Sequence, residues 1–250
     1  MMYKKYTALV LALVVLAAEA TTAPRQLLAP LLLQAQQEKF TDLGITATVN
    51  DYVDETISML VPHIQNFGLD PMQLPDIEEG FEVRYLLITY SAVLKIHDGY
   101  MSGLVNVQRS GDQTVNYFAK MLRVRVELQF SDLEFYYNYL LKVMRIGPTG
   151  GIRGSLDSFK VVTDILIDFN NDEIHLQQFS LTDIGRLRVR LTGNILTDWL
   201  FNPTIAVFVR IFDTIIMKVV EVNIRNAIHG GVGFVNSNLK DIIDTLESFN

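Results

Sequence analysis

The chain has 250 residues, of which 49% are hydrophobic, and a formal net charge of −7 at pH 7. Such an acidic chain is a poor candidate for nucleic-acid binding, which depends on clustered positive charge. The absence of cysteine excludes disulfides, iron–sulfur clusters, cysteine zinc sites and a thiol nucleophile.

The N-terminus has the pattern of a secretory signal peptide. Lys4 and Lys5 precede an uncharged apolar run at residues 8–18, and Ala18 and Ala20 are the small residues that a signal peptidase requires. The run is shorter than the roughly 20 residues of a membrane-spanning helix, so a retained anchor is the weaker alternative. We predict a signal peptide at residues 1–20, a secreted, extracellular protein, and a poorly ordered lead-in at residues 21–44.

The first predicted element of the mature chain is an amphipathic helix at residues 45–67. Its apolar residues recur at intervals of three and four, with Asp51 and Asp54 on the opposite face. Gly68 suits the end of this helix, and Pro62 is expected to kink or restrict its last turn.

A series of alternating apolar and polar residues then predicts strands at residues 81–96, 101–109, 116–130, 133–145, 155–169, 174–182 and 187–191. Short turns such as His97-Asp98-Gly99 and Ser110-Gly111-Asp112 separate several of them. Turns of this length make neighbouring strands antiparallel.

Two helices complete the prediction. Asn202-Pro203 suits the start of a long, mostly apolar helix that runs to about residue 228, before Gly230-Gly231. A last short helix is expected at residues 239–249. We therefore predict an α+β fold in a single lipid-binding-like domain, residues 45–250, with a curved antiparallel sheet wrapped around the long C-terminal helix.

The sequence carries no motif that predicts catalysis, a metal or a cofactor. The four histidines are scattered, without ligand spacing. The glycine-rich segment at residues 229–233 is not accompanied by a Gly-x-Ser-x-Gly nucleophile elbow, which disfavours the alternative of a hydrolase. We predict a protein that is not an enzyme.

Three segments resemble the mite group 7 allergen family and its arthropod members. They are residues 70–76 (Asp-Pro-Met-Gln-Leu-Pro-Asp), residues 102–112, which end in Arg-Ser-Gly-Asp, and residues 193–208, which contain Asn202-Pro203. That family belongs to the BPI-like, or tubular lipid-binding (TULIP), superfamily, so the resemblance implies a BPI-like super-roll, a secreted protein and a cavity for lipid-like molecules. The insect takeout and juvenile-hormone-binding group is a more distant likeness; its N-terminal disulfide is absent here.

The predicted function is a non-enzymatic carrier of a small hydrophobic ligand such as a lipid, fatty acid or terpenoid, without stable membrane insertion. Basic residues on the strand at residues 187–191 are either a solvated face or a contact for anionic lipid. The alternative function is an extracellular interaction or pattern-recognition module with a solid core.

The candidate ligand-binding residues are apolar or aromatic side chains on the inward faces of the predicted helices and strands. Apolar walls with a few phenol hydroxyls are typical of ligand cavities, although any one of these side chains also suits a close-packed core. The candidates are Leu60, Ile64, Leu122, Val124, Val126, Leu128, Phe135, Tyr137, Tyr139, Leu141, Phe208, Phe212 and Ile216.

Overall fold

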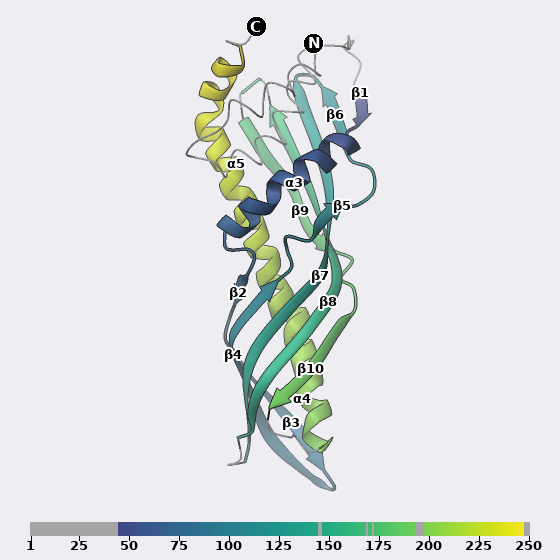
Figure 1. Ribbon diagram of the computed structural model, residues 1–250, viewed down its shortest axis with the longest axis vertical. Helices are drawn as coiled ribbons and strands as arrows, with labels where there is room; N and C mark the ends of the chain where they lie inside the picture. The colour runs from purple at the N-terminus through teal and green to yellow at the C-terminus, as the bar shows by residue number, and fades with distance from the viewer. Residues whose placement is uncertain (1–44, 145–146, 169, 172, 194–197, 248–250) are drawn as a thin grey trace.

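The computed structural model describes residues 45–144, 147–168, 170–171, 173–193 and 198–247. The predicted signal peptide and lead-in lie outside these residues. The chain forms an elongated antiparallel sheet of ten strands with a long C-terminal helix along it (Figure 1). The elements are β1 (Ile45–Thr48), α3 (Asn50–Asn66), β2 (Met72–Leu74), β3 (Ile77–Tyr85), β4 (Ile88–Ser102), β5 (Val107–Arg109), β6 (Thr114–Phe118), β7 (Met121–Val143), β8 (Thr149–Asp168), β9 (Glu173–Thr182), β10 (Leu187–Gly193), α4 (Asp198–Ile211), the π-helical turn η1 (Phe212–Ile216) and α5 (Met217–Glu247).

The antiparallel pair β7 and β8 runs the length of the sheet. β7 has 23 residues, about 75 Å at 3.3 Å per residue. The first half of β7 pairs with β5 and β6 on one side and with the second half of β8 on the other, and β9 pairs with that half of β8. The second half of β7 pairs with β4 on one side and with the first half of β8 on the other, and β10 pairs with that half of β8. The sheet therefore has two halves that share these central strands.

The inward face of β7 changes parity at Asp132. Even-numbered residues from Leu122 to Phe130 point inward before it, and odd-numbered residues from Leu133 to Val143 point inward after it. Asp132 has a φ of 53°, which breaks the strict alternation of an extended strand. A Cβ on Gly103 would lie 2.7 Å from the Asp132 carbonyl oxygen, so the close approach of the chain at residue 103 to β7 requires a glycine.

Helices α4 and α5 form one rod, joined by η1. Phe208 and Phe212 are fully buried against Phe135 of β7, with ring centroids 5.7 and 5.0 Å from it. Such aromatic contacts add to the free energy of burying the rings. They make the second half of the sheet a packed core.

No helix within the described residues is long and apolar enough to span a bilayer.

Two polar contacts hold α3 against the first half of the sheet. The Arg109 guanidinium donates to both carboxylate oxygens of Asp54, over 2.8 and 2.9 Å. The Asn50 side chain accepts from the backbone N–H of Gln113 over 2.8 Å. The buried Gln113 amide in turn bonds both the backbone N–H and the carbonyl of Glu127 in β7. The helix is thus fixed to the strands beneath it at its N-terminal end.

The segment after α3 is fixed as well. Gly68, with a φ of 66°, ends the helix as predicted, and the N–H of Leu69 donates back to the Ile64 carbonyl. Asp70 then accepts from the N–H groups of Gly103 and Val105, over 3.0 and 2.9 Å. Two of the three segments that resemble the allergen family are therefore in direct contact.

The predicted fold class, a curved antiparallel sheet along a long C-terminal helix with an N-terminal amphipathic helix, is confirmed. Several strand boundaries are wrong. Residues 81–96 belong to a hairpin that turns at Leu86, which has a φ of 55°. The predicted turn at residues 97–99 is a bulge inside β4, where Gly99 lies beneath the Tyr137 ring. Residues 116–130 form a hairpin that turns at residues 119–120, and β7 continues through residue 132 instead of ending there.

The helix boundaries also need correction. Residues 45–48 form a strand because their backbone groups pair with β6. The second helix begins at Asp198, not at Asn202, because Trp199 and Leu200 already pack on the core. The helix does not end at Gly230-Gly231, and no separate helix starts at residue 239. Beyond the glycines, the Asn236 amide bonds both the N–H and the carbonyl of Ile174 in β9, which holds α5 against the sheet.

We predict that Phe212→Ala lowers the free energy of unfolding by about 3–5 kcal/mol, because it removes a fully buried ring from a packed aromatic cluster. Urea unfolding measures the change. The matched control is Val222→Ala on the exposed side of the same rod, which is expected to have a small effect. Equal losses in both variants would contradict the packing described here.

A second prediction concerns pH. The hydrogen bonds from Arg109 lower the pKa of the Asp54 carboxyl below its ordinary value of 3.8. The pair therefore stabilises the fold above that value, and the contribution is lost as the pH falls through the lowered pKa. Asp54→Asn should reduce the melting temperature at neutral pH, and the difference from the unmodified protein should shrink in acid. Thermal unfolding across pH tests this; a difference independent of pH would show that the ion pair does not hold α3.

Candidate functional site

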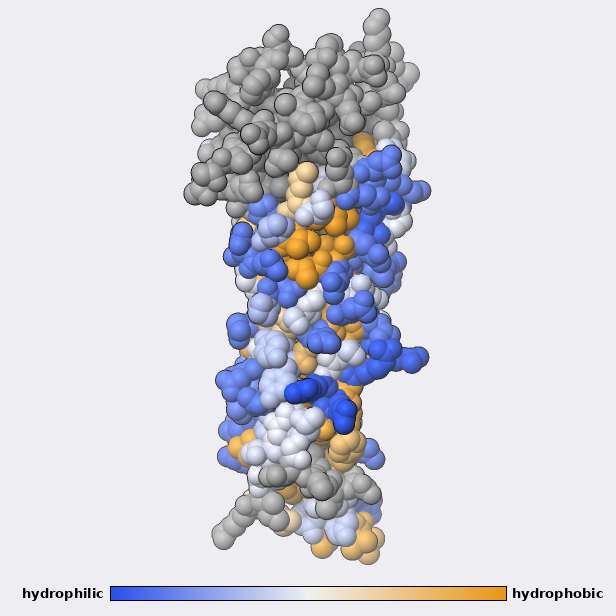
Figure 2. All heavy atoms as spheres, viewed as in Figure 1, coloured by the Kyte–Doolittle hydropathy of each residue, from blue (hydrophilic) through white to orange (hydrophobic). Residues whose placement is uncertain are grey.

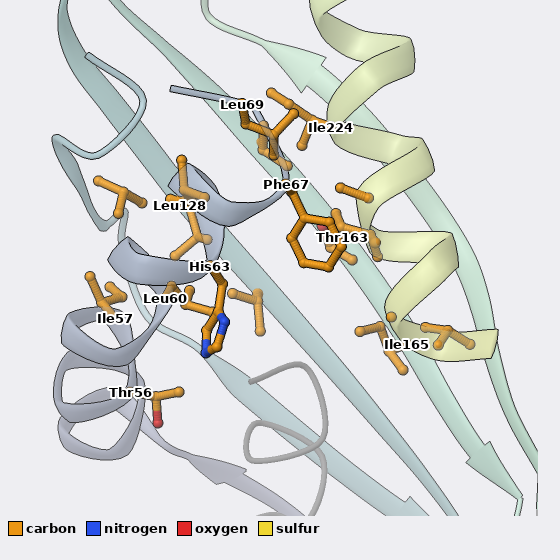
Figure 3. Close-up of a pocket in the computed structure, with 18 of the residues that line it drawn as sticks. Thr56, Ile57, Leu60, His63, Phe67, Leu69, Leu128, Thr163, Ile165 and Ile224 are labelled. Atoms are coloured by element: carbon orange, nitrogen blue, oxygen red, sulfur yellow. The ribbon is translucent and has the colours of Figure 1, made fainter. Parts of the chain in front are cut away.

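A cavity of about 170 Å³ lies between α3 and α5, over the first half of β7 and the second half of β8. Figure 3 shows side chains of α3 and α5 facing each other across the strands, with Phe67 at the end of α3 between the two helices. In the space-filling view, hydrophobic side chains gather on this face at the same level (Figure 2). The cavity is partly open and not fully enclosed.

The cavity walls follow from the periods of their elements. A helix presents one face at intervals of three and four residues, and a strand presents one face at every second residue. Most of the lining residues have these spacings: Val53, Thr56, Ile57, Leu60, His63, Ile64 and Phe67 on α3 and its end; Ile224, Ala227, Ile228, Gly231, Val232 and Val235 on α5; and Val124, Val126, Leu128, Phe130, Val161, Thr163 and Ile165 on the two strands.

The lining is almost wholly apolar. Among the described residues that border the cavity, the only polar side chains are Thr56, His63 and Thr163, and none is an acid, a lysine or an arginine. Burial of apolar surface is therefore the main interaction that this site offers a ligand.

The cavity exists because the two helical walls lie apart and small residues face the gap. Ala227 and the buried Gly231 are on the cavity side of α5, where larger side chains would fill the space. In the other half of the sheet, the buried rings of Phe208 and Phe212 occupy the corresponding position on the rod and pack against Phe135 of β7. The rod thus presents large rings to one half of the sheet and small residues to the other.

The structure brings five of the thirteen candidate residues to the cavity and places the other eight in the core. Leu60 and Ile64 of α3, with Val124, Val126 and Leu128 of β7, line the cavity. The remaining candidates are buried without bordering it: Leu122, Phe135, Tyr137, Tyr139, Leu141, Phe208, Phe212 and Ile216.

The two tyrosines among these eight are part of the packed half. The Tyr137 hydroxyl donates to the carbonyl of Pro75 over 3.2 Å, so a backbone group supplies the partner that a buried phenol needs. Burial raises the pKa of both phenols, and the nearby Asp76 carboxylate contributes to the rise at Tyr137.

Sequence reasoning missed the contribution of α5 to the cavity. The residues at positions 224, 227, 228, 231, 232 and 235 have the spacing of one helix face. This period was readable in the sequence, but the glycines at positions 230 and 231 favoured a helix end. Within the described residues, no group of three or more histidine or acidic side chains is arranged to hold a metal ion.

The chain is similar to a known protein family. The family model described as Group 7 allergen matches residues 48–231. The mite allergen Der f 7 of Dermatophagoides farinae is 21% identical over 176 residues, which cover 70% of this chain and 81% of the relative.

Two solved structures are also similar. Takeout 1 of Epiphyas postvittana has a TM-score of 0.45 at 13% identity, covering 74% of this chain and 90% of that one. Lipopolysaccharide binding protein has a TM-score of 0.48 at 14% identity, covering 80% of this chain and 42% of that one. The family model spans α3, the strands from β2 to β10, α4, η1 and α5 as far as residue 231. The resemblance seen in the sequence is thus confirmed, and the chain belongs to the group 7 allergen family.

Proposed function

We propose that this protein is a secreted, non-enzymatic binder of small hydrophobic molecules, and that the ligand occupies the cavity between α3 and α5. The observation that carries the proposal is a cavity with apolar walls in the half of the sheet that the aromatic cluster on the rod does not fill. Interiors rarely keep such space, because packing of side chains is favourable. The predicted signal peptide supports secretion.

The size of the cavity limits the ligand. A cavity of 150 Å³ with apolar walls binds benzene, whereas pockets for drug-sized ligands measure about 300–1,000 Å³. At about 170 Å³, this site suits one apolar group or a segment of an acyl or isoprenoid chain, and the remainder of a longer ligand would lie along the opening. Burial of roughly 300 Å² of ligand surface contributes about 7 kcal/mol before the cost of ordering, which corresponds to binding no tighter than micromolar.

The chemistry of the walls supports a binder over an enzyme. A catalytic site requires a nucleophile, a base or a metal within reach of one another. Among the residues that the structure describes, the lining offers two threonines and one histidine between apolar side chains, and no carboxylate. These groups suit the orientation of one polar atom of a ligand better than bond cleavage.

The first test measures binding of a fluorescent fatty-acid probe to the purified mature protein and its displacement by unlabelled fatty acids of different chain lengths. Gly231→Leu is the blocking variant. Gly231 is buried on the cavity wall, so a leucine there should fill much of the space and weaken probe binding by at least about tenfold. Leucine also favours a helix more than glycine does, so helix propensity does not oppose the substitution.

The control is Gly230→Leu, which makes the same substitution one residue earlier. Gly230 is exposed, and no heavy atom lies within 4 Å of an added Cβ. Its binding should equal that of the unmodified protein. If unlabelled fatty acids of every chain length fail to displace the probe, or if both glycine variants bind the probe equally well, the ligand does not occupy this cavity. Mass spectrometry of gently extracted protein then separates a carrier, which releases bound lipid, from a module with a solid core.

A further inference from the structure

An exposed apolar cluster lies at the end of the molecule opposite the cavity. The β3–β4 hairpin turns at Leu86 and Leu87, which are 80% and 87% exposed, and Ile88 follows, also exposed. In Figure 1 this hairpin forms the lower end of the molecule, and Figure 2 shows hydrophobic side chains at the same extremity. We name the apolar tip as Tyr85, Leu86, Leu87, Ile88 and Trp199.

The folding of the hairpin does not require leucine at the turn. Two-residue hairpin turns favour glycine, asparagine or aspartate, because at least one turn residue has a positive φ. Leu86 has a φ of 55°, a conformation that its branched side chain disfavours. Neither turn leucine is buried by the protein itself. The conformation of Leu86 therefore lowers local stability, and its exposed side chain gains no burial that would offset the cost.

The apolar tip projects beyond the central strands, and aromatic side chains lie just behind the turn. Pairing of β4 with β7 ends at Ala92 and Val143, so the last residues of the hairpin extend past the central strands. The Trp199 ring at the start of α4 lies 5.0 Å from that of Tyr85 and 6.1 Å from that of Tyr90. Residues 85–90 contain no charged side chain.

We propose that the apolar tip docks the protein onto the surface of a lipid bilayer, with Leu86 and Leu87 inserted at the boundary of head groups and acyl chains. Aliphatic residues at a projecting point, with tyrosine and tryptophan just behind them, suit the layered polarity of that boundary. The docking is separate from ligand binding in the cavity, so either proposal can fail without the other.

The shape of the tip favours a bilayer over a protein partner or a second copy. A stable protein interface buries about 800 Å² on each side, whereas the tip is a convex two-residue turn with its flanking residues. A bilayer closes around a convex projection. The free N–H and C=O groups of the turn need water or head groups as partners, so insertion stays shallow.

The test uses the mature full-length protein and vesicles of phosphatidylcholine, with flotation to measure binding. Trp199 is the only tryptophan in the chain, so its fluorescence reports directly on the tip and should shift to shorter wavelength on docking. The blocking variant is Leu86→Gly with Leu87→Asn, which replaces the exposed leucines by residues that the turn prefers. It should weaken vesicle binding by at least about tenfold.

The matched control is Phe118→Asn, beside the β6–β7 turn at the other end of the sheet. Phe118 is 61% exposed, so this variant also reduces the exposed apolar surface, and it should bind vesicles like the unmodified protein. Probe binding in the cavity should be unchanged in both variants. Three results would overturn the proposal: no vesicle binding by the unmodified protein, equal binding by the turn variant, or self-association in solution that depends on the two leucines.

Discussion

The pairing of β7 with β8 is the interaction on which the rest of the structure depends. Both strands cross the whole sheet, and their register is continuous from Met121↔Asp168 to Leu140↔Thr149. The positive φ at Asp132 changes which residues of β7 face inward without interrupting this register. One long hairpin can therefore provide the inner wall of two different interiors. Each interior then depends on the helix that covers it.

The two interiors differ because the covering helices present side chains of different size. At the α4 and η1 end, Phe208 and Phe212 fill the space over the sheet and stack on Phe135. At the α5 end, Ala227 and Gly231 face the strands, and α3 stands across from them. Because α3 is fixed by Arg109, Asn50 and the segment at Asp70, it does not collapse onto the strands. A rigid wall on one side and small residues on the other keep the cavity open.

Local sequence signals succeeded where the pattern alone specifies the conformation. Alternation predicted which residues of β7 face inward on each side of Asp132, although as two separate strands, and Gly68 predicted the end of α3. They failed where a distant contact decides. Gly230 and Gly231 lower helix propensity, but α5 continues beyond them. It is stabilised there by the two hydrogen bonds of the Asn236 amide to the backbone of Ile174 and by packing against the sheet. Likewise, Tyr137 suited a ligand site by composition, and its actual partner, the Pro75 carbonyl, is 62 residues away in the chain.

By itself, the sequence determined the fold class, the inward faces of the long strands, the family and the absence of cysteine chemistry, because these depend on residue type and on periods of two and 3.6 residues. Only the tertiary structure decided which inward residues border empty space. Side chains such as Val126 and Tyr139 are both inward and apolar in the sequence, yet the first lines the cavity and the second is packed. The difference depends on the distance between the strand and the helix that covers it, and on the size of the side chains on that helix. The local sequence pattern of the strand specifies neither.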